Sequence, residues 1–227
     1  SPSGSDSAAG SASAPLRTVQ KGIDKAAPGD TIILRDGTYG PTGGAGSMGA
    51  TVNKAGTASA WITLKAENRW AAVLDCQLTC HSYINLGASA AYWRFLDLDI
   101  RNGSSGGIWS NAGGGKNILV QGNRIHHIGN RTDTTQFGIV GIYTDAGGQN
   151  FRVEGNVIHD VGRTNVYTNS FDHGVYAHGH LIIVNNVFYN SLAGWHIQTA
   201  SNFSGTIAHN TFFGPNQFAG KTGQIML

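Results

Sequence analysis

The sequence predicts an all-β protein folded as a right-handed parallel β-helix, a solenoid that begins with a short helix. Two short phrases recur in strict order along the second half of the chain, about every 20 to 34 residues, which is typical of a solenoid and not of a β-sandwich. The composition agrees, because 33 of the 227 residues are Gly and only 12% are charged. Such a chain is rich in bends and poor in long solvated helices.

The first phrase contains Asn in four of its five copies, and Asn suits a bend because it tolerates left-handed backbone and bonds to the amide of the next coil. We therefore expect an internal ladder of amides. The copies occupy 97–100, 122–125, 155–158, 185–188 and 209–212, and we take Asp99, Asn123, Asn156, Asn186 and Asn210 as equivalent positions.

The second phrase begins with Gly, at 107–109, 141–143, 174–176, 194–196 and 223–225. Side chains alternate between the two faces of a strand. If the middle residue of each phrase points inward, the third points to solvent. This predicts an outward column of Trp109, Tyr143, Tyr176, His196 and Ile225, and a second column, two residues on, of Asn111, Asp145, His178 and Gln198.

The first half of the chain contains one helix and several strands. Leu16, Val19, Ile23 and Ala26 share one helical face, and Pro28 with Gly29 must end that helix. Alternating segments predict strands at 31–34, 61–65, 82–86 and 93–100.

One domain preceded by a linker is expected along the chain. Residues 1–15 are rich in Ser, Ala and Gly and predict a disordered linker, whereas 16–227 form the β-helix. The last coil ends at 224–227 without a polar cap. We therefore expect either that the β-helix is truncated there or that a second copy covers it by end-to-end self-association.

Several classes of function are disfavoured. No run of about 18 apolar residues is present to cross a membrane. The net charge is +2 without a Lys and Arg cluster, so nucleic acid is a poor partner. Cys76 and Cys80 predict either a local disulfide in a secreted protein or two buried thiols, and they have no further ligands to complete a metal site.

The segments 27–39 and 56–64, following the helix, resemble the start of secreted right-handed β-helix proteins of the pectate-lyase-like superfamily, especially the branch of alginate lyases and chondroitinase B. The resemblance covers most of 16–227. It implies that the helix caps the open end of the solenoid, that the protein is extracellular or periplasmic, and that long acidic polysaccharides are its ligands. It leaves calcium open as a cofactor, although the clustered Asp residues that hold calcium in pectate lyases have no counterpart in this sequence.

Two adjacent coils carry the expected binding wall. The separation from Asn123 to Gly141 and from Asn156 to Gly174 is 18 residues, against 8 from Asn186 to Gly194. Insertions on one face of a solenoid commonly form its binding surface. The loops at 130–137 and 163–171 supply two arginines, Arg131 and Arg163.

These positions predict a polysaccharide lyase that cleaves a uronic-acid polymer by β-elimination, which needs a base, an acid and a group that neutralises the carboxylate. His178 or His173 is the expected base, although alternation turns His173 inward. Tyr176 is the expected acid, and Arg163 with Arg131 the expected neutralising pair. The remaining residues expected to bind substrate are Trp109, Tyr143, Asp145, His196 and Asp172. His126, His127 and His159 are interpreted as structural.

Two alternatives remain open at this stage. A glycoside hydrolase of the same fold would need two carboxylates about 5 to 10 Å apart. Asp145, however, is expected to lie beside His178 in the next coil. Asp172 precedes His178 on the same strand by about 20 Å of extended chain, so the two carboxylates would be too far apart. A carbohydrate-binding or adhesive solenoid would need only the stacked aromatic side chains.

Overall fold

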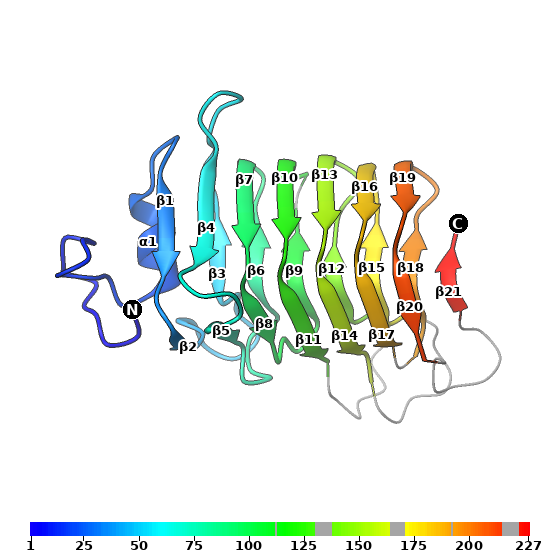
Figure 1. Cartoon of the computed structure of the whole chain (residues 1–227), viewed down its shortest axis with the longest axis horizontal. Helices are drawn as coiled ribbons and strands as arrows, with labels where there is room; N and C mark the ends of the chain where they lie inside the picture. The colour runs from blue at the N-terminus through cyan, green and yellow to red at the C-terminus, as the bar shows by residue number, and fades with distance from the viewer. Residues whose placement is uncertain (112, 130–137, 164–170, 192, 215–222) are drawn as a thin grey trace.

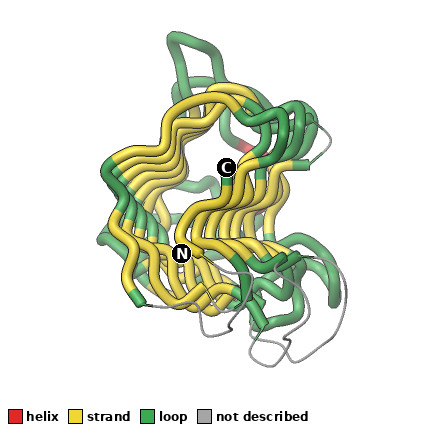
Figure 2. Tube along the Cα trace, turned by 90° about the vertical axis from the view of Figure 1, so that its right-hand side faces the viewer, coloured by secondary structure: helices red, strands yellow, loops and turns green. Residues whose placement is uncertain are grey.

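The computed structural model describes residues 1–111, 113–129, 138–163, 171–191, 193–214 and 223–227. Within these ranges the chain winds through three parallel sheets of seven strands each, and each coil adds one strand to every sheet. Viewed along the axis, the coils superimpose around a common interior (Figure 2). The predicted right-handed parallel β-helix is confirmed.

The bounds of the elements follow the coils in order. The helix is α1 (Val19–Lys25). The first sheet contains β1 (Thr31–Leu34), β4 (Ile62–Ala66), β7 (Ala91–Leu96), β10 (Lys116–Gln121), β13 (Gln149–Glu154), β16 (His180–Val184) and β19 (Ser204–Ala208). The second contains β2 (Gly37–Tyr39), β5 (Ala72–Asp75), β8 (Asp99–Arg101), β11 (Arg124–Ile128), β14 (Val157–Val161), β17 (Val187–Ser191) and β20 (Thr211–Phe213). The third contains β3 (Ala50–Val52), β6 (Ser82–Leu86), β9 (Gly106–Ser110), β12 (Val140–Tyr143), β15 (His173–Ala177), β18 (Trp195–Thr199) and β21 (Gly223–Met226).

The helix α1 lies beside β1 at the end of the solenoid (Figure 1). The Thr18 hydroxyl begins it by accepting a hydrogen bond from the backbone N–H of Lys21. Val19 and Ile23 are buried on the face toward the first coil. The helix thus covers apolar surface that would otherwise face water at this end.

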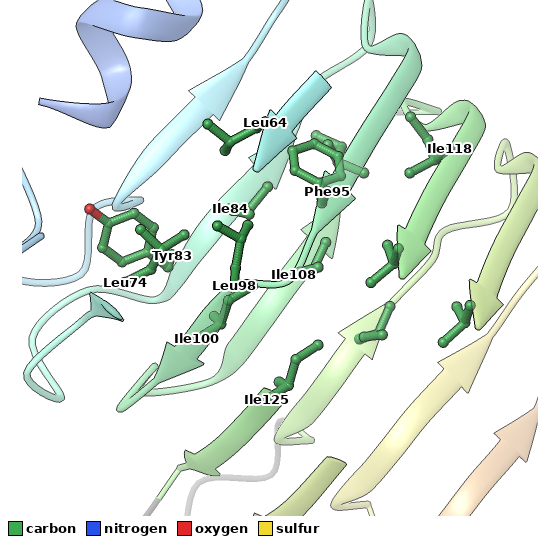
Figure 3. Close-up of a cluster of buried hydrophobic side chains, with 14 of the residues drawn as sticks. Leu64, Leu74, Tyr83, Ile84, Phe95, Leu98, Ile100, Ile108, Ile118 and Ile125 are labelled. Atoms are coloured by element: carbon green, nitrogen blue, oxygen red, sulfur yellow. The ribbon is translucent and has the colours of Figure 1, made fainter. Parts of the chain in front are cut away.

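The interior is filled by aliphatic and aromatic side chains that repeat from coil to coil (Figure 3). In the third sheet Ile84, Ile108, Ile142, Val175 and Ile197 occupy the same position in five successive coils, each fully buried. Because equivalent residues stack in register, one residue type suits the same place in every coil.

The expected Asn ladder is present, with Asn123, Asn156, Asn186 and Asn210 in consecutive coils. Each amide nitrogen donates to the amide oxygen of the next Asn, at 2.9 to 3.1 Å. Asp99 is not part of the ladder, which corrects the predicted alignment: Asp99 pairs with Arg124, and Leu98 holds the ladder position. A second correction concerns the backbone. At these bends the residue with left-handed backbone is the one before the ladder Asn, as at Gly122 and Gly155, and not the Asn itself.

Replacing Asn156 by Ala should lower the free energy of unfolding by about 2 to 4 kcal/mol, because it leaves buried donors of Asn123 and the Val120 carbonyl without partners. Urea denaturation measures this loss. The matched control is Asn210→Ala at the half-buried end of the ladder, where water can replace the lost bonds and the cost should be about 1 kcal/mol. Equal losses at the two sites would contradict the role of burial.

The strand predicted at 93–100 is divided in the structure. β7 ends at Leu96 and β8 begins at Asp99, because Asp97 adopts left-handed backbone (φ 58°) and turns the chain from the first sheet to the second. The strands predicted at 31–34 and 82–86 have the predicted bounds, and the one at 61–65 is shifted by one residue.

Residues 1–15, which the sequence predicts to be a linker, form a series of turns in the structure. The Asp6 carboxylate accepts from the backbone N–H groups of Arg17 and Thr18, at 3.0 and 2.9 Å, and the Lys25 ammonium donates to the Ala8 and Ala9 carbonyls. The segment is therefore attached to the capping helix.

A disulfide joins Cys76 to Cys80 directly after β5, with the two Cα atoms 5.1 Å apart. Of the two states that the sequence leaves open for these cysteines, the structure contains the disulfide. Among the described residues, no helix is long and apolar enough to cross a lipid bilayer.

Candidate functional site

The outer face of the third sheet carries a column of half-buried side chains, which we call the aromatic strip: His81, Trp109, Tyr143, Tyr176 and His178. β9, β12 and β15 place Trp109, Tyr143 and Tyr176 directly beside one another in register. Period-two alternation accounts for their orientation, since Ile108, Ile142 and Val175 point into the core. The predicted outward placement of these three aromatic residues is confirmed.

The rings of the aromatic strip are in continuous contact along the solenoid axis. Trp109 stacks on Tyr143 with ring centroids 4.3 Å apart, and His81 meets the other side of Trp109 edge-on at 4.6 Å. Tyr176 lies 4.6 Å from His178. The stacked rings of Trp109 and Tyr143 therefore lie next to two groups that can transfer protons, the Tyr176 hydroxyl and the His178 imidazole.

His178 is held at its backbone by Thr144 in the preceding coil. The fully buried Thr144 hydroxyl accepts from the His178 N–H at 2.9 Å and donates to the His178 carbonyl at 3.0 Å. The peptide groups around His178 are thus fixed while its half-buried imidazole stays accessible. A reactive group benefits from this rigidity, because orientation is part of catalysis.

Asp145 follows β12 and shapes the turn there. Its carboxylate accepts from the backbone N–H groups of Gly113, at 2.5 Å, and Gly147, at 3.1 Å. Burial, the Asp145 charge and Tyr176 together raise the pKa of Tyr143. Tyr143 is thus a neutral stacking surface at neutral pH.

His196 does not belong to the outward column, which corrects the sequence prediction. β18 pairs with β15 so that Gln198 lies beside Tyr176, and His196 is fully buried with its Nδ1 2.6 Å from the Ser191 hydroxyl oxygen. The prediction aligned Gly194 with Gly174, two residues out of register. In the last coil Met226, and not Ile225, lies in line with Gln198, which is a difference of one residue.

A close approach between coils explains why Gly recurs at this corner. A Cβ atom on Gly141 would lie 2.5 Å from the Gly174 carbonyl oxygen, and one on Gly107 would lie 2.7 Å from the Gly141 carbonyl oxygen. In the next coil His196 takes the equivalent position, and its ring lies beside the rings of Phe188 and Phe212. In this coil the position of the repeated Gly is therefore taken by His196, and aligning glycines gives the wrong strand register.

Arg163 and Asp172 are both fully buried and bind one another, instead of facing a substrate as predicted. The Arg163 guanidinium donates two hydrogen bonds to the Asp172 carboxylate, at 3.0 and 2.7 Å. The same carboxylate accepts from the backbone N–H groups of Arg163 and Ile139. This ion pair closes the base of the long turn between β14 and β15.

His173 lies inside the fold, with 1% of its surface exposed, and its Nδ1 accepts a long hydrogen bond of 3.3 Å from the Trp195 N–H. Burial lowers its pKa to about 3, so it is a weak base without a path to solvent. Of the two predicted bases, only His178 is accessible. Arg131, the second predicted neutralising group, lies outside the described residues.

The buried histidines predict a loss of stability in mild acid. Burial lowers the pKa of His173 to about 3 and that of His196 to about 4, whereas an unfolded His titrates near 6.5. Below pH 6.5 the unfolded chain takes up protons that the folded chain does not, so stability falls with pH. Between pH 6.5 and 5 the free energy of unfolding should fall by about 2 kcal/mol for each His.

Urea denaturation at pH 5, 6 and 7 tests this. His196→Phe should reduce the dependence of the free energy of unfolding on pH by about 1 kcal/mol per pH unit over this range. An unchanged slope in this variant would show that His196 is not buried in its neutral form.

The described residues of this face do not fit a calcium site. Ca²⁺ prefers six to eight oxygen ligands. Asp145 bonds to backbone N–H groups, Asp172 is bound by Arg163, and no group of three metal-ligating side chains is found along the described part of the aromatic strip.

The sequence interpretation missed His81 and misplaced Gln198. His81 immediately precedes β6, and its contact with Trp109 could be foreseen only from the three-dimensional stack. Gln198 was assigned to the second column, although it lies in the first. Aligning the buried aliphatic residues Val175 and Ile197, instead of the glycines, would have given the correct register.

Fold and site together define a right-handed parallel β-helix protein with an aromatic outer face of the kind expected to stack on sugar rings. Residues 1–139, more than half of the chain, match the family described as "Pel9A-like, right handed beta helix region". The chain belongs to this family, and the predicted pectate-lyase-like superfamily is confirmed.

The chain is also similar to individual proteins. Pectate lyase PEL9 of Emericella nidulans is 38% identical over 119 residues, which cover 47% of this chain and 28% of that enzyme. The crystal structure of pectate lyase Pel9A superimposes with a TM-score of 0.61 at 20% identity, over 87% of this chain and 46% of that one. An alginate lyase from Paenibacillus sp. str. FPU-7 gives a TM-score of 0.45 at 15% identity, over 92% and 96% of the two chains. The chain thus spans less than half the length of both pectate lyases.

Proposed function

We propose that this protein is a secreted polysaccharide lyase, which cleaves a uronic-acid polymer by β-elimination on the aromatic strip. The observation that carries the proposal is the contact between Tyr176 and His178, whose ring centroids are 4.6 Å apart at the end of a stacked aromatic surface. The family supports a lyase in general terms. The Cys76–Cys80 disulfide supports an oxidising compartment such as the extracellular space or periplasm.

The proposed reaction needs one proton removed and one supplied. The imidazole of His178 takes the proton from the carbon next to the uronate carboxyl group. The electron pair left behind forms a carbon–carbon double bond as the bond to the linking oxygen breaks, and the Tyr176 hydroxyl gives a proton to that leaving oxygen. Trp109 and Tyr143 support the neighbouring sugar rings by stacking.

The hydrolase alternative is weakened by the state of the carboxylates. A glycosidase needs two of them flanking the bond that breaks. Asp172 is fully buried against Arg163, so Asp145 has no carboxylate partner among the described side chains of this face. A binding module without activity keeps support from the stacked Trp109 and Tyr143 alone.

The test incubates the protein with pectate, alginate, glucuronan and chondroitin, with and without added Ca²⁺. A lyase gives a rise in ultraviolet absorbance from unsaturated uronate, together with one new reducing end for each bond cleaved. Reducing ends without absorbance would identify a hydrolase. Binding to one of the polymers without product would identify a carbohydrate-binding module, and each of these two results would reject the proposal.

A further inference from the structure

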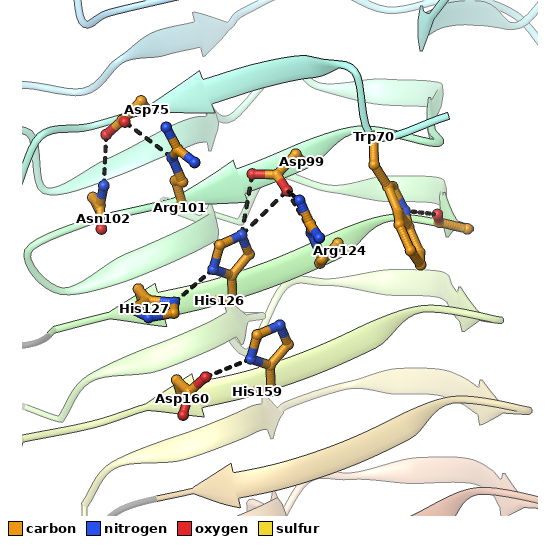
Figure 4. A network of polar contacts seen from close by, with 11 residues as sticks. Trp70, Asp75, Asp99, Arg101, Asn102, Arg124, His126, His127, His159 and Asp160 are labelled. Atoms are coloured by element: carbon orange, nitrogen blue, oxygen red, sulfur yellow. Dashed lines mark hydrogen bonds and ion pairs between the residues drawn. The ribbon is translucent and has the colours of Figure 1, made fainter. Parts of the chain in front are cut away.

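The outer face of the second sheet carries a cluster of histidine and aspartate side chains that the proposed reaction does not use (Figure 4). His126 and His127 come from β11, and His159 and Asp160 come from β14 in the next coil. This is a different sheet from the one that carries the aromatic strip. The sequence interpretation of these histidines as structural does not explain why ligand-type side chains gather here.

Left-handed backbone brings the cluster together. His127 (φ 52°) and Asp160 (φ 50°) occupy the same place in consecutive coils. A left-handed residue breaks the alternation of a strand, so two neighbouring side chains can share one face. His126 and His127 therefore approach one another, with their Nδ1 atoms 2.6 Å apart, as do His159 and Asp160, with Nδ1 2.6 Å from a carboxylate oxygen.

Stacking fixes the plane of the imidazoles. The His159 ring lies between two parallel rings, His126 on one side at 4.8 Å and Tyr189 on the other at 4.4 Å. In such a stack the ring edges, which carry the nitrogen atoms, face away from the stacking direction. The nitrogen atoms of His126 and His159 are thereby held in position without restricting His127, which is exposed.

A buried carboxylate fixes the tautomer of His126. Asp99, which is fully buried, lies 3.1 and 3.2 Å from His126 Nε2 through its two oxygens and also pairs with Arg124. An ionised carboxylate can only accept, so Nε2 carries the proton and the lone pair lies on Nδ1, toward His127. A carboxylate behind a histidine is the arrangement that orients imidazoles for metal ions.

We propose that His127, His159 and Asp160, with His126 beside them, bind a divalent transition-metal ion such as Zn²⁺ on the outer face of the second sheet. His127, His159 and Asp160 each offer one ligand atom, and these atoms all lie within 4.8 Å of one another. Two imidazoles and a carboxylate suit Zn²⁺ and related ions, whereas Ca²⁺ and Mg²⁺ prefer oxygen alone.

The required adjustment is small. Ligand atoms around a tetrahedral Zn²⁺ ion lie about 3.4 Å apart, given metal–ligand distances near 2.0 to 2.1 Å. His127 is exposed, and rotation of its side chain can bring its nitrogen closer while the stacked His159 stays in place. The bound ion would join β11 to β14 and so link two adjacent coils.

The experiment titrates Zn²⁺ into chelator-treated protein without a histidine tag and measures affinity by calorimetry and thermal stability by circular dichroism. Zn²⁺ should bind at one site per chain and raise the Tm, whereas Ca²⁺ and Mg²⁺ should do neither. The variants are His127→Asn and Asp160→Asn, since Asn tolerates left-handed backbone. Each should lower the affinity by more than the tenfold to hundredfold typical when only the partner of a ligand is lost.

The matched control is His180→Asn, an exposed histidine at the start of β16 in the first sheet. It should leave the affinity for Zn²⁺ unchanged. Circular dichroism establishes that each variant is folded before it is titrated. Three results would overturn the proposal: no binding of Zn²⁺, an affinity in His127→Asn and Asp160→Asn equal to that of the unsubstituted protein, or a loss of affinity in His180→Asn as large as in these two variants. None of these measurements depends on lyase activity.

Discussion

Replacing Tyr176 by Phe should lower the rate at which unsaturated product forms by about 100-fold to 10,000-fold, with little change in KM. The substitution keeps the ring that contacts Tyr143 and His178 and removes only the hydroxyl proposed to protonate the leaving oxygen. Loss of a positioned proton donor typically costs a factor of this size. Steady-state absorbance measurements on the polymer that yields unsaturated product give both constants.

Tyr189→Phe is the matched control for this result. Tyr189 is also a half-buried tyrosine on the outer face of a strand, but it belongs to the second sheet and stacks on His159. The control should retain full activity. A Tyr176→Phe variant that is as active as the control would remove Tyr176 from the mechanism and leave His178 to be tested by His178→Ala.

Replacing Asp172 by Ala should lower the free energy of unfolding by about 3 to 5 kcal/mol, because it leaves the Arg163 guanidinium buried without its counter-ion. The backbone N–H groups of Ile139 and Arg163 lose their acceptor as well. Urea denaturation at pH 7 measures the loss. The matched control is Glu154→Gln, which breaks the half-buried Arg152–Glu154 pair on the surface and should cost less than about 1 kcal/mol.

A double variant tests whether the loss of stability comes from leaving one buried charge without its partner. Arg163→Met combined with Asp172→Ala removes both charges, so the destabilisation should be smaller than the sum of the two single substitutions. If the loss of unfolding free energy in the double variant equals the sum of the losses in the two single variants, the two side chains do not depend on one another. The aromatic strip lies outside the pair, and any activity should survive in the folded fraction of each variant.

The fold could be predicted from the sequence because stacked coils place equivalent residues in equivalent surroundings. Asn156 and Asn186 are needed at the same bend for the same hydrogen bonds, so the repeat is visible in the sequence. The prediction failed where a coil departs from the common pattern. The bend at Asp97 has neither Gly nor Asn, and the register at His196 is hidden because a buried ring replaces the expected Gly.

The candidate site could be predicted only in part. Trp109, Tyr143 and Tyr176 follow from strict alternation along regular strands. Arg163 and Asp172 could not be assigned, because a local pattern does not reveal whether a charged side chain at the end of a long turn faces water or another charge. The cluster around His127 was also hidden, since left-handed backbone at one residue changes which neighbours share a face.

The Arg163–Asp172 pair has a consequence for how this protein can diverge. The two partners come from different strands' ends, Arg163 after β14 and Asp172 before β15, and each is fully buried. A change of either one alone leaves a buried charge without this partner, which is strongly destabilising. We therefore expect relatives to keep both residues or to replace both together, so that the two positions change as one unit during evolution.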